Sequence, residues 1–157
     1  MKRTATTLLA VMLGLSLLAG CGSDKKSGPS KEKYAEQYKP INDQFLALGK
    51  EVANTVRTAK GQTDVALADK FAQQARQVGD LKGRLQNLDP PDDYKSDHDK
   101  LLVAMGLVEG DLQEISDTAR AHDAAGAKAA TQKLFTDSAQ VRTPRRALAA
   151  KTGAKSE

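Results

Sequence analysis

Tryptophan is absent from the 157-residue chain, which has one cysteine, two histidines and only 4% aromatic residues. A single cysteine excludes an intramolecular disulfide, so the thiol is open to another use. The sequence also lacks a glycine-rich phosphate loop, a serine nucleophile elbow, a Cys-x-x-Cys-His haem motif and a Glu-x-x-His metal motif. These absences predict a protein that is not an enzyme and has no metal or other bound cofactor.

Long apolar runs are missing as well. The longest, residues 8–19, has roughly twelve residues, which at about 1.5 Å each cannot cross a hydrocarbon core of about 30 Å. It follows the cations Lys2 and Arg3 and precedes small residues, an order typical of a secretory signal peptide. We therefore expect residues 1–20 to be a signal peptide.

The apolar run ends in Leu18, Ala19, Gly20 and Cys21, which resemble the lipobox of bacterial lipoproteins. The resemblance covers only the first 21 residues. It implies that lipid is attached to the Cys21 thiol, that the chain is cleaved before this residue, and that the protein stays on the extracytoplasmic face of the cell membrane. Because no acidic residue directly follows Cys21, the resemblance favours the outer membrane if the organism has one. The alternative is an ordinary cleaved signal with an incidental cysteine.

The chain after residue 20 is nearly neutral. Loss of Lys2 and Arg3 leaves 22 basic and 20 acidic side chains, a net charge of +2, which gives no support for a nucleic-acid partner. Residues 21–30 are mostly small and polar, which predicts a flexible lipidated tether. About 120 residues remain, enough for one domain with one core.

Apolar residues recur every three or four positions in four later stretches, which predicts four amphipathic helices. The first is expected to kink or restart at Pro40 and to end near Lys60. The second should start at Thr63 or Asp64, the third after a cap at Asp89, and the fourth after a cap at Asp123. No stretch alternates as a strand would. We therefore predict an all-α fold, an antiparallel four-helix up-and-down bundle over residues 31–150, followed by a disordered basic tail at 151–157.

This topology brings one group of polar and ring-bearing side chains to the end of the bundle nearest the tether. The group consists of Tyr34, Tyr38, Tyr94, His98 and Arg142. In one interpretation the rings complete the core, and His98 forms a hydrogen bond with Tyr34 or Tyr38. In the other, the group lines a shallow pocket for a small ligand. A metal site is not expected, because the neighbouring carboxylate of Asp97 points about 100° away around the helix.

The function expected from these features is that of a membrane-anchored extracytoplasmic lipoprotein, a non-enzymatic helical-bundle binding module for another envelope component. The partner would be an envelope protein or a cell-wall polymer. The alternative is a small-ligand or metal carrier that uses the end of the bundle with the tyrosines and His98. The basic side chains near the C-terminus suggest contact with anionic lipid or cell-wall polymer, or simply a soluble tail.

Overall fold

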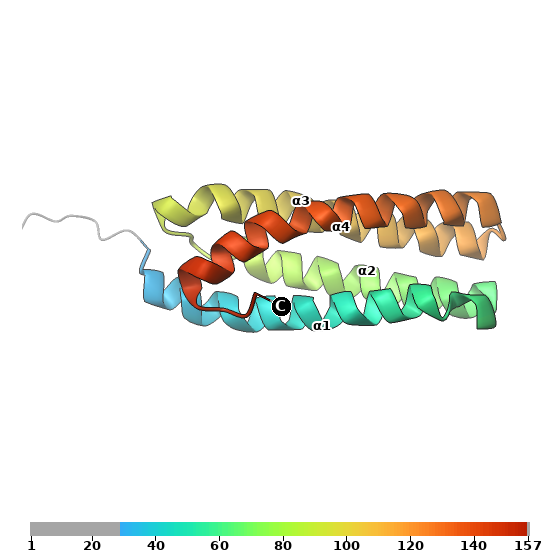
Figure 1. Ribbon diagram of the computed structural model, residues 1–157, viewed down its shortest axis with the longest axis horizontal. Helices are drawn as coiled ribbons and strands as arrows, with labels where there is room; N and C mark the ends of the chain where they lie inside the picture. The colour runs from blue at the N-terminus through green and yellow to red at the C-terminus, as the bar shows by residue number, and fades with distance from the viewer. Residues whose placement is uncertain (1–28, 157) are drawn as a thin grey trace, which may run out of the picture.

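Four long helices make up the part of the chain that the computed structural model describes, residues 29–156 (Figure 1). In chain order they are α1 (Lys31–Arg57), α2 (Asp64–Gln86), α3 (Asp92–Arg120) and α4 (Ala124–Thr152), with a short 3-10 helix, η1 (Ala59–Gly61), after α1. This range contains no β-strand, and none of its helices is long and apolar enough to cross a bilayer. The predicted all-α, antiparallel four-helix bundle is confirmed. The predicted signal peptide, Cys21 and most of the tether lie outside the described residues.

The four helices do not pack equally closely. Helix α3 packs tightly against both α2 and α4, whereas α1 makes fewer contacts with its neighbours α2 and α4. Helix α4 crosses the bundle obliquely: it lies along α3 at its start and comes down onto α1 at its C-terminal end (Figure 1). Helices α1 and α4 are therefore joined most firmly at the end of the molecule where α1 begins and α4 ends.

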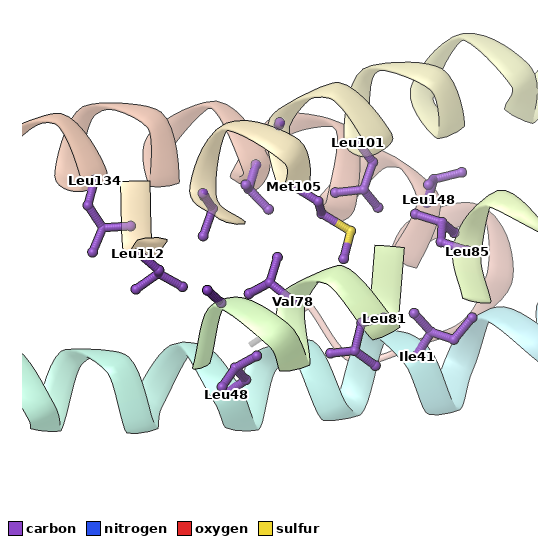
Figure 2. Packing of buried hydrophobic residues seen from close by; sticks show 14 of the residues in the cluster. Ile41, Leu48, Val78, Leu81, Leu85, Leu101, Met105, Leu112, Leu134 and Leu148 are labelled. Carbon is purple, nitrogen blue, oxygen red and sulfur yellow. The ribbon is translucent and has the colours of Figure 1, made fainter. Parts of the chain in front are cut away.

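The core follows the predicted apolar stripes. Side chains from all four helices, among them Leu48, Val78, Met105 and Leu134, point into a common interior (Figure 2). The stripe of α3 is buried from Tyr94 to Ala119. The stripe of α1 is buried in its first half but only partly buried at Phe45, Val52 and Val56 in its second half; these three pack against the core from its edge.

Two of the predicted helix caps are confirmed and one is wrong. Thr63 accepts a hydrogen bond from the Ala66 amide at the start of α2, and Asp123 accepts one from the Gly126 amide at the start of α4. Asp89 does not cap α3, which begins after Pro91 and has no side-chain cap. A residue before proline is held in an extended conformation, so the two prolines delay the helix by two positions.

The prolines inside α1 and α4 interrupt neither helix. Helix α1 runs through Pro40 and ends at Arg57, with η1 continuing to Gly61, so the predicted restart at Pro40 is wrong. The sequence likewise predicts that Pro144 kinks or ends the fourth helix; α4 runs through Pro144 to Thr152, so it does not end there. Buried residues on both sides of each proline, such as Tyr38 and Ile41 in α1, stabilise the helical path through packing.

Residues 151–156 differ from the disordered tail that was expected. Gly153 ends α4 in the left-handed conformation, with a φ of 67°, and turns the chain back over α1. The Asn42 side-chain amide donates to the Lys155 carbonyl at 2.9 Å, and the Arg145 guanidinium donates to the Ser156 carbonyl at 2.6 Å. The tail is thus held by donors that are themselves buried in the bundle.

Candidate functional site

Four of the five residues of the predicted ring-bearing group meet in one cluster. The Tyr34 ring stacks on Tyr38, with ring centroids 5.8 Å apart, and meets Tyr94 edge-on at 5.5 Å. The Tyr34 hydroxyl oxygen lies 2.9 Å from Nδ1 of His98, which confirms the predicted hydrogen bond. None of the four side chains is more than 4% exposed. The rings therefore pack against one another and leave no ring face open to solvent.

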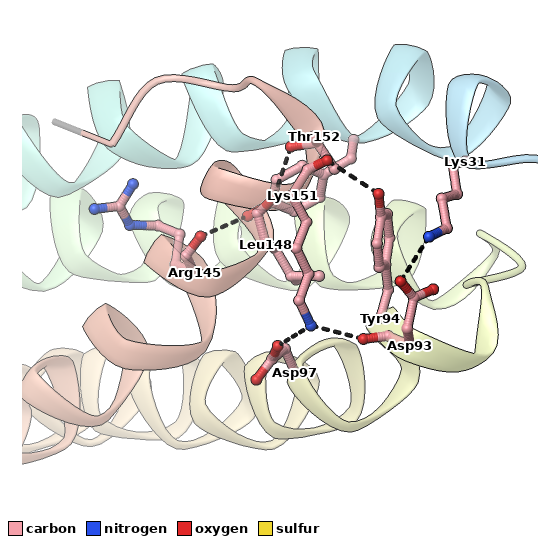
Figure 3. Close-up of polar contacts among 9 residues, drawn as sticks. Lys31, Asp93, Tyr94, Asp97, Arg145, Leu148, Lys151 and Thr152 are labelled. Atoms are coloured by element: carbon pink, nitrogen blue, oxygen red, sulfur yellow. Dashed lines mark hydrogen bonds and ion pairs between the residues drawn. The ribbon is translucent and has the colours of Figure 1, made fainter.

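The polar atoms of this ring cluster are satisfied within the bundle. The Tyr94 hydroxyl donates to the Lys151 carbonyl at 3.0 Å (Figure 3). The Tyr38 hydroxyl donates to the Arg145 carbonyl at 3.4 Å. Burial raises the pKa of Tyr34 and Tyr38, so both hydroxyls stay protonated. Burial also lowers the pKa of His98, so its imidazole is neutral at pH 7. The cluster fastens α1 and α3 to the end of α4.

Ion pairs cover the outside of the ring cluster. Lys151 donates to the Asp97 carboxylate at 2.7 Å and to the Asp93 carbonyl at 2.6 Å, and Lys31 pairs with the Asp93 carboxylate at 2.7 Å (Figure 3). Asp97 is thus held by Lys151. Within residues 29–156, no three histidine, cysteine, aspartate or glutamate side chains come together as a metal-ligand set.

Arg142, the fifth predicted residue, lies elsewhere. Because α4 continues for ten residues beyond it to Thr152, Arg142 is about 15 Å from the end of the helix along its axis. It lines a separate cavity between α1 and α4. Arg145, three residues further on, is the arginine next to the ring cluster, where its carbonyl accepts from Tyr38.

The cavity between α1 and α4 has a volume of about 430 Å³. One wall is the face of α1 from residue 45 to residue 56, the other is the face of α4 from residue 134 to residue 145, and Val78 and Val108 form the floor. Twelve of the sixteen lining residues are apolar or glycine. We call this space the α1–α4 cavity; its volume is within the usual range of small-molecule sites.

Small residues create the space. An added Cβ at Gly49 would meet no atom within 4 Å, and Ala53 lies one turn further along the same wall. Across the cavity, Ser138 is the short side chain of α4. Phe135 lines the mouth with 61% of its surface exposed, so the cavity opens to solvent.

The charges around the α1–α4 cavity have one sign. Its polar lining consists of Lys50, Arg142, Arg145 and the Ser138 hydroxyl, with no carboxylate. Arg145 is 6% exposed and holds the C-terminal tail. Lys50 and Arg142 are exposed, and neither forms an ion pair or a side-chain hydrogen bond with any residue from 29 to 156. The α1–α4 cavity therefore combines apolar walls with a cationic rim.

Two other cavities have a different character. One, of about 500 Å³, lies at the opposite end of the bundle beside Phe71 and Ile115, with the mixed charges of Asp64, Asp123 and Lys128 at its edge. The other, of about 720 Å³, lies between α1 and α2 and has mostly polar walls of both signs. Neither has the single-sign rim of the α1–α4 cavity.

Sequence reasoning missed the α1–α4 cavity. Two signals could have indicated it: Phe135 is a large apolar residue beside the stripe of α4, and Gly49 and Ala53 place two small residues at four-residue spacing on α1. Comparison of the chain with models of protein families, with curated proteins and with solved structures finds no match.

Proposed function

We propose that this chain is a membrane-anchored extracytoplasmic lipoprotein whose helical bundle is a non-enzymatic binding module for another envelope component. The anchor is supported by the lipobox-like residues that end at Cys21. The binding function is supported by one structural observation, the open apolar α1–α4 cavity with its cationic rim. A module of this kind captures its ligand while its own lipid keeps it at the membrane.

The lining of the α1–α4 cavity is suited to binding rather than to catalysis. It contains no histidine and no carboxylate that could act as a general base for the Ser138 hydroxyl. Its cations can attract and orient an anionic group, and its apolar walls can exclude water from the rest of the ligand.

The alternative carrier function at the ring cluster has less support. Tyr34, Tyr38, Tyr94 and His98 are buried against one another and use their polar atoms within the bundle. A ligand there would have to displace this packing. The α1–α4 cavity already offers space.

The anchor is tested by labelling cells that express the full chain with radioactive palmitate. We expect label and recovery in the membrane fraction for the wild-type protein, and loss of the label in Cys21→Ser. Equal labelling of the two chains, or no labelling of either, would contradict the lipid anchor.

The binding site is tested by photo-crosslinking in the same cells. A photoreactive amino acid replaces Phe135 at the mouth of the cavity, and in a matched control it replaces Val103, which is 68% exposed on α3 and outside the cavity. We expect an envelope component to be crosslinked from position 135 but not from position 103, and the product to disappear when Gly49→Phe fills the cavity. Identical products from both positions, or none from either, would overturn the binding function.

A further inference from the structure

The α1–α4 cavity has the shape and charge of a site for one class of ligand. We propose that it binds a long-chain fatty acid anion, with the hydrocarbon chain between α1 and α4 and the carboxylate at Lys50 and Arg142. This inference rests on the proposed function, because it assigns a ligand to the same cavity.

The cavity is long and narrow. Its α1 wall runs from Phe45 to Val56, which is about 17 Å at 1.5 Å per residue. Spread over that length, the 430 Å³ corresponds to a mean cross-section of about 25 Å². An α-helix with its side chains is about 10–12 Å across, which is wider than this slot. A single hydrocarbon chain lying along the two helices suits the space, and a helical peptide does not.

The walls match the chain and the rim matches the head group. Phe45, Val52 and Val56 of α1 are only partly buried in the protein alone, so a hydrocarbon chain would complete their burial. Lys50 and Arg142 are two cations without a partner among residues 29–156, and a carboxylate would give both a charge-assisted hydrogen bond. The absence of lining carboxylates means that nothing in the cavity repels an anion or attracts a cationic amphiphile.

Calorimetric titration of residues 22–157, which lack both the apolar run and the lipid-bearing cysteine and contain all the helices, tests the proposal without detergent. The ligands are dodecanoate, dodecanol and dodecyltrimethylammonium. We expect dodecanoate to bind with micromolar affinity, about tenfold more tightly than dodecanol, and the cation to bind least. Shorter fatty acids should lose up to about fourfold in affinity for each methylene removed.

Two pairs of variants locate the site. Gly49→Phe should weaken dodecanoate binding at least tenfold by filling the cavity, and Gly83→Phe is its matched control, because an added Cβ is also unobstructed there and Gly83 is outside the cavity. Ser138→Phe fills the space from α4 and serves if Gly49→Phe fails to fold by circular dichroism. Lys50→Gln combined with Arg142→Gln should abolish the preference for dodecanoate over dodecanol without changing dodecanol binding.

Binding of dodecanoate that survives both filling variants, or that is no tighter than dodecanol binding, overturns the proposal. If dodecanoate does not bind but the crosslink from position 135 persists and is lost in Gly49→Phe, the fatty-acid assignment is wrong and the binding function stands. If the crosslink is also absent, both are wrong.

Discussion

His98 is a buried imidazole that shares a hydrogen bond with the Tyr34 hydroxyl, and burial keeps its pKa below the ordinary value. The unfolded chain therefore takes up a proton below about pH 6.5 that the folded chain does not. Above about pH 6.5, His98 is neutral in both states and the protein has its full stability. As the pH falls from there towards the lower pKa of the folded state, protonation of His98 in the unfolded chain reduces the stability.

We predict that the free energy of unfolding decreases between pH 7 and pH 5, with His98 contributing up to about 2 kcal/mol of the loss. In His98→Gln, which keeps a hydrogen-bonding side chain but does not titrate, the decrease should be smaller by that amount. Urea unfolding of both proteins at the two pH values measures it. Parallel pH dependence of the two proteins would show that His98 is not the titrating group.

A second buried ionisable group lies between α3 and α4. Asp111 is fully buried and contacts Lys133, which also pairs with Asp137 at 3.2 Å. Its second carboxylate oxygen has no hydrogen-bond partner within the described chain. Burial raises the pKa of Asp111, and the nearby Lys133 only partly offsets this effect. The charged form of Asp111 therefore lowers the stability of the fold, whereas an uncharged side chain of the same shape would not.

Substitutions at this ion group should have opposite effects. We predict that Asp111→Asn is neutral or stabilising at pH 7, by up to about 1 kcal/mol, because the shape is kept and the desolvated charge is removed. Lys133→Met should lower the unfolding midpoint, because two adjacent carboxylates lose their shared cation. Because the pKa of Asp111 is raised in the folded state, Asp111 becomes neutral as the pH falls towards 4 and no longer needs the cation. The loss of stability in Lys133→Met should therefore shrink over this range. Denaturant unfolding at pH 7 and pH 4.5 checks both signs.

At the scale of the helices, the two internal prolines occupy different environments. Pro40 is exposed in α1, whereas Pro144 is buried in α4. Each lacks the amide hydrogen that a helix interior uses.

We predict that Pro40→Ala stabilises the protein by about 1–3 kcal/mol, since it restores a backbone hydrogen bond at no loss of packing. Pro144→Ala should gain less or lose stability, because it also removes buried ring atoms. Thermal unfolding of the two variants compares them. Equal gains would mean that packing of the Pro144 ring contributes nothing.

Features that depend on one helix were predictable from the sequence. The three- and four-residue spacing of apolar residues determines which face is buried, and the caps at Thr63 and Asp123 depend only on adjacent residues. The error at Asp89 is also local, because it came from treating the prolines as part of the first helical turn.

Features that depend on how helices meet were only partly predictable. The gathering of Tyr34, Tyr38, Tyr94 and His98 followed from topology alone, but the position of Arg142 did not, because it required knowing that α4 continues past Pro144. The α1–α4 cavity arises from the volumes of side chains on opposite helices, such as Gly49 and Ser138. The position of the C-terminal tail depends on hydrogen bonds from Asn42 and Arg145 to the Lys155 carbonyl. Asn42 is more than a hundred residues before Lys155 in the chain, and Arg145 is ten residues before it.

At the scale of the whole molecule, the C-terminal tail is part of the fold. Besides the hydrogen bonds from Asn42 and Arg145, Lys155 pairs with Asp43 at 3.2 Å. Two of the basic side chains near the C-terminus, Lys151 and Lys155, are therefore engaged with acids of the bundle.

We predict that a chain stopped after Gly153 is less stable by about 1–2 kcal/mol, because buried donors on Asn42 and Arg145 lose their acceptors. Urea unfolding of the two chains at pH 7 measures the difference. As a control, Lys155→Gln keeps the backbone carbonyls and should change the stability by much less. A shortened chain as stable as wild type would contradict the structural role of the tail.

The oblique path of α4 makes the two ends of the molecule unequal in their motions. At the N-terminal end of α1, the tyrosine cluster and the returning tail fasten this helix to α4. From Gly49 onward the side of α1 that faces α4 lines the cavity, and the helix is held mainly by α2, where the Gln74 amide donates to the Thr55 hydroxyl at 2.9 Å. Local opening should therefore begin in the second half of α1, and the amide hydrogens there should exchange with deuterium sooner than those of α3, which is covered on two sides. We expect such opening to widen the α1–α4 cavity from the side of α1, which would admit a slender ligand without disturbing the packing of α3 on α2 and α4.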